Sequence, residues 1–278
     1  MGGIESLGRT FAASFGANIR SVVRYYTFRG YIFSSIMFPI FMIATAWTIA
    51  RVVGGSLGDF QLRTGYPDYL SFVIVGFAFT GLVTASLEQG GNTVYSEQLE
   101  GTWELVALTP ANKFAWMAGK ILAFLLNSAL NLALVFTIGW AVFGMSVVPS
   151  GIPLATLGIF LAILSLQGFS FLMAGVGMVW KQPHAIAILL SPFFIFISGM
   201  MFPVDRLPPA VQYISYAFPL TYGLNIIRGS LLRGLAPADM ANDFVGLLIT
   251  SSVMMVFGYL VYRKMDRLAR RTGTLSTY

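Results

Sequence analysis

The chain has 278 residues, of which 56% are hydrophobic and only 10% are charged. Soluble domains carry about 25% charged residues, so the composition excludes an ordinary soluble domain and favours a protein that folds in lipid. Cysteine is absent, which excludes disulfides and cysteine-based metal or nucleophile sites, and the net charge of +6 is not gathered into the concentrated basic face of a nucleic-acid-binding protein.

The first 29 residues predict an amphipathic helix. Apolar side chains recur at spacings of three and four, which places them on one face. They are Ile4, Leu7, Phe11, Phe15, Ile19, Val22, Val23 and Tyr26. This helix is expected to lie on the inner leaflet with its arginines toward lipid phosphates, or to pack on its own membrane domain, and the two interpretations are compatible. The leader is too long for a secretory signal, so the apolar run that follows is interpreted as a retained span.

Long uncharged runs predict six transmembrane helices, since a spanning helix needs about 20 apolar residues. The longest run, 121–180, contains no Lys, Arg, Asp or Glu and must fold back at Val148-Pro-Ser-Gly-Ile-Pro153. Continuous rather than alternating apolar residues disfavour a β-barrel. The expected spans are 31–50, 69–90, 114–144, 153–179, 184–202 and 244–262. The expected fold is therefore an all-α integral membrane protein with one transmembrane domain over residues 1–278.

The distribution of basic residues predicts that both termini are cytoplasmic. With this orientation the inner side receives 12 of the 17 Lys and Arg residues, including those of a basic tail at 263–278. That excess follows the positive-inside rule. The expected location is the plasma or inner membrane.

Within the spans, a few residues break the apolar pattern. Pro39 is expected to kink the first span and Pro192 the fifth. Asn127 and Asn131 share one face of the third span, which is expected to meet another helix or a polar path. Glu88 ends the second span, where it is expected to be solvated at the interface or, facing the bundle interior, functional.

Between the fifth and sixth spans, prolines divide residues 203–233 into pieces too short to cross a bilayer. With the termini inside, this segment is expected outside, as a re-entrant helical hairpin whose backbone is satisfied by protein or water. A helix is expected to begin at Pro208 or Pro209. The residues chosen to mark the hairpin are Pro203, Pro208, Pro209, Tyr213 and Pro219.

Motifs for chemistry are absent from the sequence. Gly119-Lys120 is followed by Ile121 and lacks the upstream glycine of a phosphate loop. The single histidine, His184, offers neither a Ser-His-Asp arrangement nor a metal cluster. We therefore expect a transport protein and not an enzyme, with energy supplied by a partner through the internal segment 93–112.

That segment carries a family resemblance. Tyr95-Ser-Glu-Gln-Leu-Glu-Gly-Thr-Trp-Glu-Leu-Val-Ala-Leu-Thr-Pro110, followed by Gly119-Lys120, resembles the coupling-helix region of type-2 ATP-binding-cassette (ABC) transporter permeases. Ser198-Gly-Met-Met-Phe-Pro203, Leu207-Pro208, Pro219-Leu-Thr-Tyr222 and Ile227-Arg-Gly229 resemble the second half of the same family's signature. One departure is that members often have a basic residue just before the Glu-Gly-Thr box, where this chain has Gln98 and Leu99.

The resemblance implies that the chain pairs with a second copy or a related permease, sits on two cytoplasmic ATPase subunits, and contacts membrane lipid. It implies a coupling helix between spans 2 and 3 that docks into a groove of the ATPase. ATP and Mg²⁺ would bind to the partner, so no cofactor or metal is expected on this chain. The expected docking residues are Glu97, Glu100, Gly101, Thr102, Trp103, Glu104, Leu105, Thr109 and Pro110.

The expected function is export of a hydrophobic or amphipathic molecule, such as a drug or lipid. The alternatives are a polysaccharide or lipid-linked glycan exporter of the same family, and a membrane scaffold or carrier without an ATPase. Aromatic side chains and sparse polar groups in the spans give the candidate translocation path. It comprises Phe38, Phe41, Glu88, Asn127, Asn131, Phe193 and Phe194.

Overall fold

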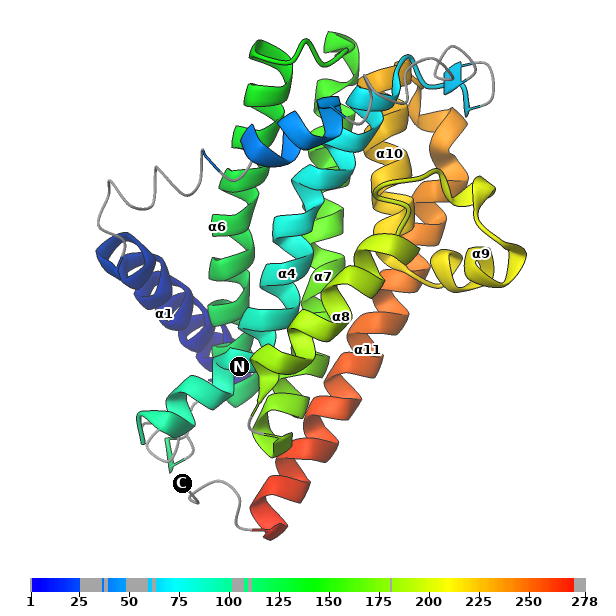
Figure 1. The fold of residues 1–278 in the computed structure, drawn as a ribbon. Coiled ribbons are helices and arrows are strands. Elements are labelled where there is room, and N and C mark those ends of the chain that lie inside the picture. Colours follow the sequence, from blue (N-terminus) through cyan, green and yellow to red (C-terminus); the bar gives the residue numbers. More distant parts are fainter. Residues whose placement is uncertain are drawn as a thin grey trace.

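The computed structural model describes residues 2–25, 37, 40–48, 60–61, 64–101, 108–109, 112–180 and 182–272, and within these ranges the regular structure is helical (Figure 1). The long helices are α1 (Gly2–Tyr25), α4 (Tyr69–Leu99), α6 (Lys113–Ala141), α7 (Ile152–Trp180) and α11 (Ala241–Thr272). Between α7 and α11 lie α8 (Pro183–Ile197), α9 (Pro209–Tyr216) and α10 (Pro219–Arg233). Short 3₁₀ turns are η2 (Pro149–Gly151), η3 (Val204–Arg206) and η4 (Pro237–Met240).

Four stretches are long and apolar enough to cross a membrane, and they agree with the predicted spans 2, 3, 4 and 6. They are Tyr69–Leu99, Lys113–Ala141, Pro149–Trp180 and Pro237–Ala269. Pro183–Ile197, where span 5 is predicted, is apolar but shorter. Half of the predicted first span, namely residues 31–36, 38–39 and 49–50, lies outside the described residues, and Pro39 with it; residues 40–48 are helical.

The bundle has inner and outer helices. Most residues of α4 and α7 are buried, whereas fewer residues of α6 and fewest of α11 are. Close backbone contacts hold the inner pair and α11 together. A Cβ at Gly177 of α7 would lie 2.5 Å from the Gly91 carbonyl oxygen of α4, and one at Gly168 would lie 2.7 Å from Met254 of α11. Small residues in these helices thus allow the backbones to pack closely.

Helix α4 runs further than the sequence suggested. The helix continues past the predicted span limit near residue 90, through Gly90 and Gly91 to Leu99. At these glycines, other segments of the same protein lie so close to α4 that a side chain would not fit. A Cβ at Gly90 would lie 2.6 Å from Ser170 of α7, and one at Gly91 would lie 2.4 Å from the Pro183 side chain. Helix packing outweighs the weak helix propensity of glycine here.

Other helix boundaries also differ from the predicted span limits. Helix α8, at the predicted fifth span, ends at Ile197, whereas the span was predicted to end at 202. Pro192 lies inside this helix, as expected. Helix α11, at the predicted sixth span, continues to Thr272, through most of the predicted basic tail. Helix α9 begins at Pro209, which confirms the predicted start, and both α9 and α10 are too short to span a bilayer.

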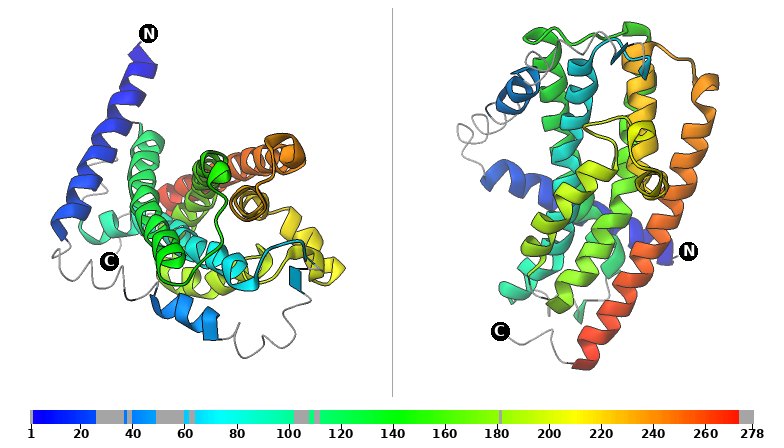
Figure 2. Two further views of the ribbon diagram at one scale, coloured as in Figure 1. Left: turned by 90° about the horizontal axis from the view of Figure 1, so that it is seen from above. Right: turned by 45° about the vertical axis from the view of Figure 1, so that its right-hand side comes forward.

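The predicted amphipathic helix exists as α1, and Figures 1 and 2 show it crossing the bundle and not running along it. It packs against the lower part of α6 in those views. The views also show that α4, α7 and α11 end on the same side of the molecule, which we call the Glu97 end. The opposite side, where α4 begins after Asp68, is called the Asp68 end.

The two ends lie on opposite sides of an apolar layer. Between Asp68 and Glu97 there are 29 residue steps, or about 43 Å of helix, more than the roughly 30 Å hydrocarbon core. At the Asp68 end, the Asp68 carboxylate accepts from the Ser71 backbone N–H at 2.6 Å and from the Ser146 hydroxyl at 3.2 Å. This cap joins the start of α4 to the loop after α6.

Candidate functional site

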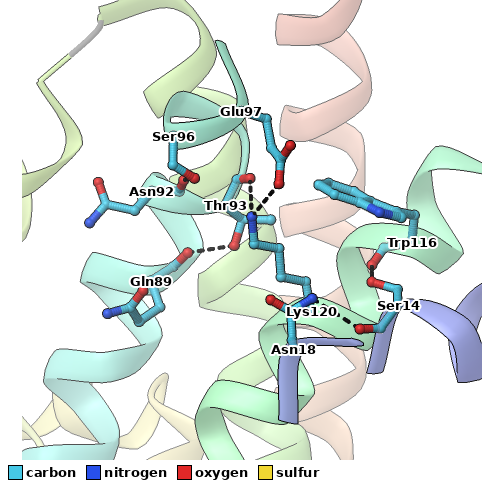
Figure 3. Close-up of polar contacts among 9 residues, drawn as sticks. All are labelled: Ser14, Asn18, Gln89, Asn92, Thr93, Ser96, Glu97, Trp116 and Lys120. Carbon is cyan, nitrogen blue, oxygen red and sulfur yellow. Dashed lines mark hydrogen bonds and ion pairs between the residues drawn. The ribbon is translucent and has the colours of Figure 1, made fainter. Parts of the chain in front are cut away.

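A buried ion pair joins α4 and α6 at the Glu97 end (Figure 3). The Lys120 ammonium donates to Glu97 Oε1 at 2.8 Å and to the Thr93 carbonyl oxygen at 3.3 Å. The exposed fractions of the two side chains are only 10% for Lys120 and 19% for Glu97. Glu97 lies one turn after Thr93 on α4, so both acceptors meet the ammonium from one helix face. Because the pair is shielded from water, each charge depends strongly on the other.

Trp116 and the first helix complete this junction. The Lys120 Nζ lies 5.2 Å from the centroid of the Trp116 ring, one turn earlier on α6, which is within cation–π range. The Ser14 hydroxyl of α1 donates to the Trp116 carbonyl oxygen at 2.7 Å. Beside this bond, Gly119 lets the helices approach, since a Cβ there would lie 2.6 Å from the Phe11 carbonyl oxygen. The polar contacts thus form one series from α1 through α6 to α4.

Beyond the ion pair, α4 ends in an exposed turn. Gly101 adopts φ +70°, the left-handed conformation typical of a glycine that ends a helix, and its N–H donates to the Gln98 carbonyl oxygen at 3.2 Å. Leu99 and Leu108 are 56% and 84% exposed, and Glu100 is exposed between them in sequence. Exposed large apolar side chains at the end of a bundle are typical of a surface that contacts another protein.

Gln98 is an exception within this turn. Its side chain is buried, yet neither its amide nitrogen nor its amide oxygen has a hydrogen-bond partner in the structure. An unsatisfied buried amide costs roughly 1–3 kcal/mol. This residue stands where the sequence departs from the family pattern. The turn is therefore built with one polar side chain that the described part of the chain leaves unsatisfied.

Of the predicted docking residues, the structure places Glu97, Glu100, Gly101 and Thr109 at this end. Glu100, Gly101 and Thr109 are exposed, whereas Glu97 binds Lys120 of its own chain. Five others lie outside the described residues. They are Thr102, Trp103, Glu104, Leu105 and Pro110. Sequence reasoning missed the role of Lys120, although a lone lysine in a long apolar run was a signal that it needs a partner.

The predicted path residues do not form one described cluster. Glu88 Oε1 lies 3.7 Å from His184 Nδ1, with 65% of the histidine side chain exposed, so this contact belongs to the α4–α8 surface near the Glu97 end. Asn127 and Asn131 are half-buried on α6. Phe194 packs on Phe169 and Phe218 at centroid distances of 5.1 and 4.6 Å. Phe41 and Phe193 are 70% and 52% exposed, and Phe38 is outside the described residues.

The predicted hairpin residues shape the connection from α8 to α10. Pro203, Pro208 and Phe218 each precede a helical turn, while Pro209 and Pro219 occupy first-turn positions, where proline is compatible with a helix. Tyr213 is 80% exposed. The Tyr216 hydroxyl donates to Asp205 Oδ1 at 2.9 Å. The pKa of Tyr216 is raised to about 12, mainly by burial and secondly by this hydrogen bond.

Helix α10 contains a buried arginine whose environment the sequence does not indicate. Arg228 is 2% exposed and donates to backbone carbonyls of α4 and of the turn after α8. Only the three-dimensional packing of α10 between other helices could reveal this. Across the described ranges, no group of three or more His, Asp or Glu residues is arranged to hold a metal ion.

Comparisons with known proteins bear on this architecture. The family model described as ABC-2 type transporter matches residues 17–232. The chain is 27% identical over 194 residues to a protein named Nodulation protein J from Sinorhizobium fredii (strain NBRC 101917 / NGR234), which covers 65% of this chain and 68% of that protein. It is 25% identical over 225 residues to the Nodulation protein J of Rhizobium meliloti (strain 1021), covering 74% and 77%.

A further relative is named Inner membrane transport permease YhhJ, from Escherichia coli (strain K12). The identity is 26% over 178 residues, which is 63% of this chain and 46% of that protein. The chain therefore spans less than half of this longer relative.

Proposed function

The chain belongs to the ABC-2 type transporter family, and from that premise we propose that it is the transmembrane subunit of an ATP-driven exporter whose ATPase docks at the Glu97 end. The observation that carries the proposal is the exposed turn at the end of α4. It presents Leu99 and Glu100 to solvent beyond the apolar layer, and it is anchored to the bundle by the Lys120–Glu97 pair. Leu108, shortly before α6, is exposed as well. A surface that receives force needs both properties, namely an accessible contact and a stiff connection.

In this proposal Glu97 has a role different from that of Glu100. Glu97 fixes α4 to α6, while the exposed Glu100 is free of the bundle side chains that hold Glu97 and faces the partner. Docking also offers Gln98 the hydrogen-bond partner that it lacks. Closure of the ATPases on ATP would then displace the end of α4, and through the ion pair the start of α6 and its contact with α1.

The proposal places the Glu97 end and both termini in the cytoplasm of a six-span protein of the plasma or inner membrane, following the basic-residue excess. Two permeases, identical or related, would enclose the path. The segment 203–233 would form the external re-entrant hairpin. The cargo class proposed is a hydrophobic or amphipathic molecule, because the described spans are lined by apolar and aromatic side chains. A polysaccharide or lipid-linked glycan remains the second candidate within the family.

Co-purification from native membranes tests the ATPase partner. We expect an ATPase subunit to follow the wild-type permease, and Glu100→Arg and Leu108→Ser each to lower its recovery, by about tenfold if the substitution removes a central contact. Tyr213→Ala is the matched control, since Tyr213 is equally exposed on α9, away from this end. Absence of an ATPase with the wild type, or equal recovery with all three variants, would contradict the proposal and favour a scaffold or self-contained carrier.

A further inference from the structure

A polar pocket lies between the loop before α4, the η3 turn, α9 and α10, with a volume of about 100 Å³. One water occupies roughly 30 Å³ of liquid, so the space is larger than a single ordered water needs. The lining residues are Thr64, Tyr66, Phe72, Pro203, Val204, Asp205, Arg206, Tyr216, Asn225 and Arg228. None of the proposed ATPase-docking residues and none of the predicted path residues line this pocket.

Arg228 is the most unusual group in the pocket wall. Its Nε and Nη2 donate to the Phe72 carbonyl oxygen at 3.2 and 3.1 Å, Nη2 also donates to the Met200 carbonyl oxygen at 2.7 Å, and Nη1 donates to the Gly199 carbonyl oxygen at 2.8 Å. The guanidinium carbon lies 3.5 Å from the centroid of the Phe72 ring. A guanidinium has five N–H donors, and these four bonds leave one Nη1 hydrogen for another acceptor.

All of these partners are neutral. Within the part of the chain that the structure describes, Arg228 makes no ion pair, although it is 98% shielded from solvent. Carbonyl dipoles solvate a cation in part, but a buried charge without a countercharge is costly, and buried charges in proteins are usually paired. The site therefore supplies a positive charge and a free donor but no matching anion.

The nearby carboxylates already have other partners. Asp205 Oδ1 accepts from the Tyr216 hydroxyl at 2.9 Å, and Asp243 Oδ1 accepts from Asn225 Nδ2 at 3.1 Å. Among the lining residues there are two arginines, Arg206 and Arg228, against the one carboxylate of Asp205. Burial raises the pKa of the Tyr66 phenol, which keeps it a neutral hydrogen-bond donor at physiological pH. The wall is thus richer in positive charge and donors than in acceptors.

We propose that this pocket binds an oxyanion, a phosphate group, with Arg228 at its base and Arg206 at its exposed side. The inference does not rest on the proposed export function, because it concerns only the permease and needs neither an ATPase nor a cargo. The phosphate could come from the free ion or from the headgroup of a membrane lipid, since both present the same charged oxygens to the guanidinium. The occupied pocket would hold the α8–η3 turn, α4 and α10 together through one shared charge.

Phosphate titration of the purified permease tests the site. The protein is placed in phosphatidylcholine nanodiscs at constant ionic strength, and its apparent melting temperature is followed as inorganic phosphate replaces chloride. We expect the wild type to be stabilised by phosphate. Arg228→Lys keeps the charge but loses the planar fork, and Arg206→Gln removes an exposed cation; each is expected to raise the apparent Kd by about tenfold. Arg267→Gln, an exposed arginine at the Glu97 end, is the matched control and should leave the Kd unchanged.

The two sources of phosphate are separated by repeating the titration in phosphatidylglycerol nanodiscs. If lipid headgroups occupy the pocket, these discs will stabilise the wild type without added phosphate and weaken its response to the free ion, and Arg206→Gln will reduce both effects. If the free ion is the ligand, the response will be the same in both lipids. No stabilisation of the wild type by either source, or a response in Arg206→Gln and Arg228→Lys equal to that of the wild type, would overturn the proposal.

Discussion

Lys120 shows how a single charge can link two helices. It is the eighth residue of α6, in an otherwise apolar helix, and its ammonium reaches the last two turns of α4. The Thr93 carbonyl oxygen and the Glu97 carboxylate together offer it the acceptors that water would otherwise supply. Because the side chains are largely shielded, removing either partner leaves a poorly solvated charge, whereas exchanging both preserves the pair.

The first prediction follows from this dependence. Lys120→Met and Glu97→Gln should each destabilise the permease by about 2–3 kcal/mol, because each leaves its former partner shielded and unpaired. The exchanged double variant, Glu97→Lys with Lys120→Glu, should recover part of the loss. Thermal unfolding in nanodiscs measures the effect.

Glu88→Gln provides the comparison for these variants. Its contact with His184 is longer, at 3.7 Å, and the histidine is largely exposed, so the change should be below about 1 kcal/mol. Equal losses in Glu88→Gln and Glu97→Gln would mean that the Lys120 pair has no special weight.

At the scale of residues, the sequence drew attention to Glu97 but not to its partner. The acidic island drew attention to Glu97, but Lys120 lies 23 positions later on another helix, and no local pattern connects them. The burial of Arg228, which the motif Ile227-Arg-Gly229 includes, could not be predicted, because its partners are the backbone carbonyls of Phe72, Gly199 and Met200, which any residue type can supply. Contacts between side chain and backbone leave no complementary residue in the sequence to find.

At the scale of helices, α1 and α6 meet through a contact that depends on a missing side chain. Gly119 of α6 lies directly against the backbone of α1 at Phe11, and Ser14 of α1 bonds the carbonyl of Trp116 nearby. The hydrophobic spacing of residues 1–29 predicted the helix itself correctly. Its position on α6 could not be predicted, because an amphipathic face fits a membrane surface as well as a neighbouring helix.

The second prediction concerns this contact. Gly119→Ala should separate α1 from α6, since the added methyl carbon would lie 2.6 Å from the Phe11 carbonyl oxygen and 3.1 Å from the Phe15 nitrogen, and both atoms belong to backbone. Hydrogen–deuterium exchange should rise throughout α1 and the apparent melting temperature should fall.

Gly81→Ala is the control for this substitution. Gly81 is exposed within α4 and has no atom near the position of an added Cβ, so alanine there should be neutral or stabilising by about 0.5–1 kcal/mol through its better helix propensity. Unchanged exchange of α1 in Gly119→Ala would show that the two helices are not held by this approach.

At the scale of the whole molecule, the helices differ in how deeply they are buried, and hydropathy does not indicate this difference. The exposed apolar side chains of α11 suit contact with lipid, whereas α4 and α7 form the packed interior. Both kinds of helix are apolar, so hydropathy located the spans but could not distinguish inner from outer ones. The extension of α4 to Leu99 was missed for a related reason, because the two helical glycines are explained only by the close approach of α7 and of Pro183.

The third prediction tests the orientation proposed for the molecule. The chain has no cysteine, so single cysteines can be labelled without background. Tyr213→Cys on exposed α9 should react with an impermeant maleimide added to intact cells, while Glu100→Cys should react only after the membrane is opened. The reverse pattern would invert the topology, and labelling of both from outside would exclude a transmembrane arrangement of α4.

The unbroken length of α4 has a mechanical consequence. If the helix turns as a rigid rod about its tight contact at Gly90, the arm toward Leu99 is about 14 Å and the arm toward Tyr69 about 32 Å, so a displacement at the short arm is roughly doubled at the long one. On the long arm, Gly76 lies against the Met200 carbonyl oxygen, which Arg228 also binds. With these proportions, a small displacement at the Glu97 end would become a larger displacement of the turn after α8, which leads to the segment 203–233.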